Sequence, residues 1–262
     1  MAAIAATVFA MCAACGMPNQ SASNERFVDG DVASANGNWQ AIADAIMADG
    51  KVTRAETEQA IESYYQCMDE NGFSGSYAID LDIYYWVDGG SWGLDPDVPG
   101  YQRLPERFHD PDASGTTQDD FSSYLRSAEG KALMANNDKL EKEHREPCKV
   151  FDKVDEMAQA AVDWAAYDRR KFDAIVRCIA ANAPAYADRA RSVAYGFGDI
   201  STGVMKLGEE FFGKGDEHWA EFVSKPAGSE EYKLNQCFQN PNGVPMRYFG
   251  QAEYSGENRG AQ

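Results

Sequence analysis

Four widely spaced cysteines, Cys67, Cys148, Cys178 and Cys237, constrain the fold of this chain more than any other feature. None of them lies in a C-x-x-C pair or beside a histidine, which argues against a zinc or redox site. An even number of cysteines in an exported protein typically forms disulfides. We therefore expect two disulfides if the chain leaves the reducing cytoplasm, and four buried free thiols if it does not.

Four cysteines allow three connectivities. We favour the sequential one, Cys67–Cys148 and Cys178–Cys237, whose sequence separations are 81 and 59 residues. Chain-entropy arguments give on the order of 4 kcal/mol for each such cross-link. That free energy is comparable with the whole stability of a marginal domain.

The start of the chain indicates export. An uncharged, apolar run from Ala2 to Ala14 precedes Cys15, and a polar stretch follows it. This order is typical of a bacterial lipoprotein signal, in which the Cys receives the lipid and becomes the mature N-terminus. The run is too short to cross a bilayer as a helix. We therefore predict a palmitate-bearing anchor on Cys15, which would hold the protein on the extracytoplasmic face of the cell membrane.

Two features depart from that pattern. The position three residues before Cys15, usually Leu, is Cys12, and no Lys or Arg precedes the apolar run. We expect the native start codon to lie further upstream and to supply the basic residues. Cys12 is a competing lipid site, although the bulky Met11 before it disfavours cleavage there. An ordinary secretory signal that has lost its first residues is the other alternative.

Composition and periodicity divide the chain into four parts. Residues 1–14 are the predicted signal, and residues 15–37, rich in Ser, Asn, Gly and Asp, are a flexible tether. A single mainly helical domain is expected over 38–240, because apolar residues there recur mostly at helical spacing. Residues 241–262 are predicted to form a loop-like C-terminal tail.

Start and stop signals place several of the helices. Thr53 and Glu56 fit a capping box at the start of a helix that would end at Asn71-Gly72. An apolar stripe from Val150 to Trp164 predicts another helix, and Asp168 on the line of the next stripe suggests a break or bend. Shorter helices are expected at 186–195, 203–212, 216–224 and 228–238.

One segment changes period. Residues 77–87 alternate between apolar and mixed positions, which predicts a short strand or β-hairpin. A long loop from about residue 88 to 116, dense in Gly, Pro and Asp, follows it; such loops are often functional or disordered. The fold class is therefore mainly α, with a short strand or hairpin, braced by two disulfides.

The formal net charge of −18 excludes some partners. The first fifteen residues carry no charged side chain, so this charge belongs to the mature protein. Such a surface repels nucleic acid and anionic lipid headgroups, and it is compatible with cations, basic partners or neutral sugars. We therefore expect no nucleic-acid partner.

Three motifs have simpler explanations than the sites they resemble. The stretch 49–56 resembles half of a calcium loop, but Ala45 and Met47 stand where oxygen ligands are needed. Gly89-Gly90-Ser91-Trp92-Gly93 matches the hydrolase elbow, but the Pro-rich stretch after it cannot form the required helix. The three histidines form no metal-binding spacing. We assign no catalytic residue, metal or cofactor.

Aromatic residues around the predicted strand are the best candidate binding site. Tyr84, Trp86 and Trp92 could form an exposed platform for a sugar or a partner protein of the envelope, and the alternative is that these rings close a small core. Nearby loop carboxylates support a competing hypothesis, a glycan-acting or cell-wall hydrolase. These carboxylates are Asp95, Asp97, Asp110 and Asp112. Asp-Pro pairs are also common in ordinary turns.

Two further similarities concern the cysteine helices. The segments around Cys67 and Cys178 each place a cysteine late on an amphipathic helix, which suggests a loose internal duplication. The signal cysteine, the stretch 49–56 and the stretch 67–73 also resemble uncharacterised exported lipoproteins of actinobacteria with paired cysteines. This resemblance implies an extracytoplasmic location and disulfides, and it implies no particular chemistry. The leading hypothesis is therefore a lipid-anchored, non-catalytic surface-binding or envelope-associated protein.

Overall fold

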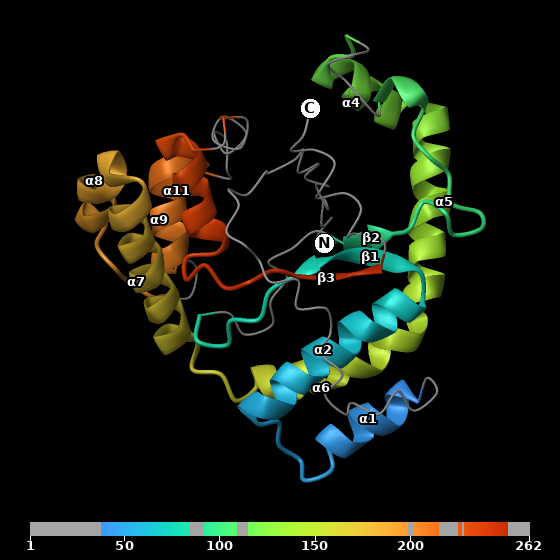
Figure 1. Ribbon diagram of the computed structural model, residues 1–262, viewed down its shortest axis with the longest axis horizontal. Coiled ribbons are helices and arrows are strands. Elements are labelled where there is room, and N and C mark those ends of the chain that lie inside the picture. Colours follow the sequence, from blue (N-terminus) through green and yellow to red (C-terminus); the bar gives the residue numbers. More distant parts are fainter. Residues whose placement is uncertain are drawn as a thin grey trace. The chain divides into compact units, whose positions relative to one another are not determined.

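The computed structural model describes residues 38–83, 92–108, 115–198, 202–214, 225–226 and 228–250. These residues are mainly helical and include a three-stranded sheet (Figure 1). The expected fold class is confirmed, as are both disulfides. The chain divides into a first unit, Glu25–Tyr167 with Val244–Ala252, and a second unit, Asp168–Gly243. The single domain expected over 38–240 stays a prediction.

The first unit contains the sheet and most of the described helices. Its helices α1 and α6 both pack against α2, and α4 packs against α5 (Figure 1). Its elements are α1 (Trp39–Ile46), α2 (Arg54–Glu70), β1 (Phe73–Tyr77), β2 (Trp92–Leu94), η1 (Glu106–Phe108), α4 (Gln118–Arg126), α5 (Ala128–Arg145), η2 (Glu146–Phe151), α6 (Asp152–Gln159) and β3 (Arg247–Phe249).

Helix α2 begins and ends as the sequence predicted. The Thr53 hydroxyl accepts a hydrogen bond from the Glu56 amide, and the Glu56 carboxylate accepts one from the Thr53 amide at 2.7 Å. Helix α2 is followed by Asn71 and then by Gly72. The φ of Gly72 is 82°, a left-handed backbone conformation that favours glycine. A Cβ at this position would lie only 2.7 Å from the Val98 side chain. The turn after α2 therefore needs glycine for both its conformation and its packing.

The sheet differs from the predicted strand. Its order is β2-β1-β3, and both pairings are antiparallel. The prediction of a strand over 77–87 is wrong for the described part, because β1 ends at Tyr77 and residues 81–83 form a turn. Residues 84–87 lie outside the described residues. The predicted loop-like tail also contains a strand, β3, which pairs with β1.

The Cys67–Cys148 disulfide lies in the core of the first unit. It joins α2 to η2, and both cysteines are fully buried. Nearby in the same core, the rings of Tyr65 and Tyr77 stack at 4.0 Å, and the ring of Phe249 lies 5.2 Å from Tyr65. Helix α2 is therefore fixed on one side by a covalent bond and on another by the sheet.

Arg247 attaches strand β3 to α2 by charge. Its guanidinium donates to the Glu62 carboxylate and lies 3.9 Å from the Glu58 carboxylate. It is also close to the buried Tyr77, whose pKa is raised to about 12, chiefly by burial. These side chains are only partly buried, so solvent screening keeps the stabilisation from each ion pair small.

The second unit is a small helical cluster around the other disulfide. Its core side chains come from four described helices, α7, α8, α9 and α11, and Cys178–Cys237 joins α7 to α11. Its elements are most of α7 (Trp164–Asn182), η3 (Pro184–Tyr186), α8 (Ala187–Ser192), α9 (Gly203–Phe212) and α11 (Glu230–Gln239). The helix predicted at 203–212 matches α9, while the one predicted at 216–224 lies outside the described residues.

Asp168 does not break a helix as the sequence suggested. Helix α7 runs through it, and the predicted helix over 150–164 is interrupted earlier, at residues 160–163. The Asp168 carboxylate accepts hydrogen bonds from the amides of Gly203 at 2.8 Å and Val204 at 3.3 Å. A carboxylate at this position satisfies amides that the first turn of α9 leaves without a partner. The side chain therefore joins α7 to the start of α9.

Within the described ranges, none of the helices has both the length and the apolar character that crossing a membrane requires. The two disulfides belong to the cores of the two units: Cys67, Cys148 and Cys237 are members of these cores, and Cys178 packs against the second one. Their cysteine residues differ in burial, however. Cys67 and Cys148 are fully buried, whereas Cys178 is only partly buried.

This difference predicts the order of reduction. A thiolate must reach a sulfur atom to open a disulfide, so the Cys178–Cys237 bond should open first under a mild reductant. Alkylation followed by peptide mass spectrometry should label Cys178 and Cys237 well before Cys67 and Cys148. Equal labelling rates in the folded protein, or earlier labelling of Cys67, would contradict this account of access.

Candidate functional site

The predicted anchor, Cys15, lies outside the described residues, so lipidation stays a prediction. The four cysteines among the described residues are all engaged in disulfides with normal Cα–Cα separations of 5.7 Å and 5.5 Å. Their role in the described structure is to cross-link helices. A functional site must therefore be sought among other side chains.

An asparagine accompanies each disulfide, and the sequence analysis missed it. The Asn71 amide donates to the Cys67 carbonyl at 2.8 Å and lies 3.6 Å from the Cys67 sulfur. Asn182 does the same at Cys178, at 3.1 Å and 3.5 Å. The spacing Cys-x-x-x-Asn in both helices was the available signal. Both asparagines satisfy carbonyls near the C-terminal ends of their helices.

Trp92 is the only member of the predicted aromatic platform among the described residues. Its ring lies edge-on to Phe73, with centroids 5.7 Å apart, and it packs against the core of the first unit. The Arg145 guanidinium lies 5.7 Å from the Trp92 centroid and 5.8 Å from that of Tyr64. In the described structure, Trp92 thus covers part of the core of the first unit, and the Arg145 guanidinium lies near its ring. Tyr84 and Trp86 lie outside the described residues, so the platform stays a prediction.

The loop carboxylates that can be placed have structural roles. The Asp95 carboxylate accepts a hydrogen bond from the Asp97 amide at 2.8 Å, the geometry of an Asx turn. The Asp97 carboxylate forms an exposed ion pair with Arg103 at 2.6 Å. Asp110 and Asp112 lie outside the described residues. The hydrolase hypothesis therefore gains no acid–base pair from Asp95 and Asp97.

No group of three His, Cys, Asp or Glu side chains within the described ranges is arranged to hold a metal ion. One of the histidines, His144, has a structural contact instead. Its Nδ1 lies 2.7 Å from the Asn71 carbonyl oxygen, so it ties α5 to the end of α2. This contact gives His144 a structural role.

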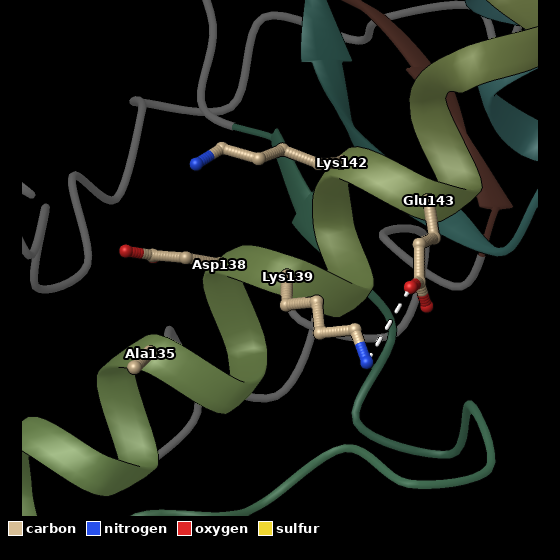
Figure 2. Close-up of a pocket in the computed structure, with 5 residues that line it drawn as sticks. All are labelled: Ala135, Asp138, Lys139, Lys142 and Glu143. Carbon is tan, nitrogen blue, oxygen red and sulfur yellow. Dashed lines mark ion pairs between the residues drawn. The ribbon is translucent and has the colours of Figure 1, made fainter.

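A shallow hollow lies along α5. Figure 2 shows Ala135, Asp138, Lys139, Lys142 and Glu143 around it, all from this one helix. Lys139 and Glu143 form an exposed ion pair at 3.7 Å, one turn apart. A surface built by one helix and covered by long, solvated side chains offers little to enclose a ligand. We interpret it as a solvated helix face.

A second, open cleft is lined by several elements. It has a volume of about 500 Å³ and lies between η1, α4 and the start of α5. Its lining combines a guanidinium, two carboxylates, hydroxyl groups and the rings of Phe108 and Tyr124. Sequence analysis missed this cleft because no motif marks it. The cleft depends on how α4 folds back on α5, and unlike the hollow along α5 it is lined by residues of more than one element.

No protein-family model, curated protein or solved structure matches the chain. Any function must therefore be argued from the residues and their geometry. The features available for that argument are the signal-like N-terminus, the disulfides, the acidic charge and the η1–α4–α5 cleft.

The environment of Trp92 predicts that it supports the fold. We expect Trp92→Ala to lower the free energy of unfolding by about 2 kcal/mol, somewhat less than the loss typical of a fully buried ring. Trp164 is the matched control because it is 45% exposed; its replacement by Ala should cost less than about 1 kcal/mol. Urea denaturation measures both values. A loss at Trp92 no larger than that at Trp164 would favour an exposed platform.

Glu141 on α5 predicts a pH effect. Burial, with a smaller contribution from Asp138, raises the pKa of its carboxyl above the ordinary value. The folded protein therefore holds this proton more tightly than the unfolded chain. The resulting stabilisation is present in acid and is lost as pH rises from the ordinary Glu pKa through the raised one.

We therefore expect Glu141→Gln to stabilise the protein at neutral pH by roughly 0.5 kcal/mol, a value kept small by solvent screening. The gain should shrink at pH 4, where the native carboxyl is largely protonated. Glu143→Gln is the control, because it removes an exposed charge that pairs with Lys139. Urea denaturation at both pH values makes the comparison. A gain of equal size at both would refute the assignment to a raised pKa.

Proposed function

We propose that this protein is an extracytoplasmic binding protein held at the cell membrane by a lipid on Cys15. The apolar run, the small residues around Cys15 and the polar tether after it support the anchor. The protein would thus present the disulfide-braced units outside the cytoplasm. Binding, and no chemical conversion, would be its activity.

The two disulfides are the observation that carries this proposal. Each joins helices across 81 or 59 residues of sequence, and three of the four cysteines are almost completely buried. Such bonds form and persist mainly in oxidising compartments. The acidic surface fits the same setting, because it would keep the protein off anionic headgroups and leave the lipid as its membrane contact.

The two loop carboxylates among the described residues, Asp95 and Asp97, favour binding over hydrolysis. A glycosidase needs two carboxyl groups facing each other across roughly 5–10 Å of open cleft. Asp95 and Asp97 instead belong to one turn, where Asp95 accepts the Asp97 amide and Asp97 pairs with Arg103. The η1–α4–α5 cleft, by contrast, has a mixed polar and aromatic lining that suits recognition.

The anchor is tested by replacing Cys15 with Ala in the full chain, expressed in a bacterial host that processes lipoproteins. We expect loss of metabolic palmitate labelling and release of the protein into the medium, because the modified thiol is gone. Cys12→Ala is the matched control and should keep both the label and the membrane association. Palmitate labelling that persists in Cys15→Ala and vanishes in Cys12→Ala would move the anchor to Cys12. Membrane association unchanged in both variants would refute the lipid anchor.

A further inference from the structure

The walls of the η1–α4–α5 cleft are fixed by local hydrogen bonds. A capping box at the start of α4 joins Thr117 to Asp120. The Ser127 hydroxyl, between α4 and α5, donates to the Tyr124 carbonyl at 2.6 Å and accepts from the Gly130 amide at 3.1 Å. The Thr116 hydroxyl donates to the Arg107 carbonyl at 3.0 Å and so holds the rim to η1. The cleft is therefore largely preformed, as small-molecule sites usually are.

A glycine allows the α4–α5 corner that shapes this cleft. A Cβ at Gly130 would lie 2.1 Å from the Tyr124 carbonyl oxygen, well inside any real contact. The first turn of α5 thus comes closer to the last turn of α4 than any other residue would permit. This close approach brings Ser123 and Tyr124 of α4 beside Glu129 of α5 along the same lining.

The floor of the cleft is aromatic and carries a cation. Phe108 and Tyr124 are 3% and 6% exposed, and their ring centroids lie 5.0 Å apart. The exposed Arg107 guanidinium lies 4.7 Å from the Phe108 centroid and 5.8 Å from that of Tyr124. This contact with the rings restrains a planar group of hydrogen-bond donors at the lining of the cleft and reduces the entropy lost on binding.

Residues with acceptor groups line the same cleft. Asp120, Ser123 and Glu129 are among its lining residues, and one carboxylate oxygen of Asp120 accepts from the Thr117 amide and hydroxyl. Hydrogen bonds from Thr117, with a smaller contribution from Arg107, lower the pKa of Asp120, so it remains an ionised acceptor. The lining therefore presents donors, acceptors and a hydroxyl that can be either. A ligand that fits it should offer several groups able both to donate and to accept.

Charge decides between the ligands that meet this description. The first unit contains 29 acidic and 13 basic residues, a net charge of −16, whereas Asp168–Gly243 contains 11 and 10. An anionic ligand would have to enter this negative field and meet two carboxylates for one guanidinium. A small cation would meet that guanidinium on the floor of the cleft. A neutral polyol meets neither repulsion. Its hydroxyl groups can pair with both the donors and the acceptors of the lining.

We propose that the η1–α4–α5 cleft binds a neutral saccharide unit of a glycan, through Arg107, Asp120, Ser123 and Glu129. This inference rests on the proposed binding function and names its ligand class. The cleft volume of about 500 Å³ lies in the range of small-molecule sites. The cleft is also open to solvent, as it must be if the saccharide belongs to a longer chain.

The test uses the full chain with Cys15→Ala, isolated from the medium, and an array of neutral oligosaccharides built from glucose, mannose, arabinose and N-acetylglucosamine. Saturation-transfer NMR then confirms any binding. Arg107→Met should weaken the affinity roughly tenfold or more, because it removes charged donors yet keeps an apolar chain over the rings. Glu129→Gln should give a smaller loss. Arg103→Met is the control: this exposed arginine pairs with Asp97 outside the described lining, and its loss should leave saccharide affinity unchanged.

Three results would overturn the proposal. No binding of any neutral oligosaccharide at millimolar concentration would remove the ligand class, while lipid labelling of Cys15 would still report on the anchor. Binding unchanged by Arg107→Met and Glu129→Gln would place the site elsewhere and leave the binding function standing. Tighter binding of uronic-acid oligosaccharides than of neutral ones would refute the charge argument.

Discussion

Each unit of this protein depends on a disulfide between a long helix and a segment far along the chain. In the first unit, Cys67 joins α2 to Cys148 in η2, directly after α5. The bond fixes α2 against the end of α5, and the stacked rings of Tyr65 and Tyr77 fix the sheet on α2. At its other end, α5 forms one wall of the cleft proposed to bind saccharide. Covalent staples of this kind help small cores remain folded outside the cell.

The two disulfide helices share more than a cysteine. Asn71 and Asn182 stand four residues after Cys67 and Cys178, and each donates to the cysteine carbonyl beside the sulfur. In both units the second cysteine follows the helix in sequence. The second cysteines lie in different kinds of element, a 3-10 segment and an α-helix, so the loose duplication suggested by the sequence stays a prediction. The charges of the two units nevertheless differ widely, so one would keep the binding role and the other a largely neutral surface.

Local sequence rules predicted what local interactions determine. The Thr53–Glu56 capping box marked the start of α2, and apolar spacing found α9. Predictions failed where contacts distant in sequence decide. Alternation over 77–87 suggested a strand, but β1 comes earlier because its partners, β2 and β3, pair with 73–77. Asp168 looked like a helix breaker until the start of α9 supplied amides for its carboxylate. The cleft could not be predicted, because it depends on the turn between α4 and α5.

The proposed extracytoplasmic protein must form both of its disulfides in an oxidising compartment. The most direct test is peptide mapping of the protein isolated from the membrane fraction without reductant, with free thiols alkylated first. We predict two linked peptide pairs, Cys67 with Cys148 and Cys178 with Cys237, and no alkylation at these four positions. Four alkylated thiols, or a peptide linking Cys67 to Cys237, would contradict it.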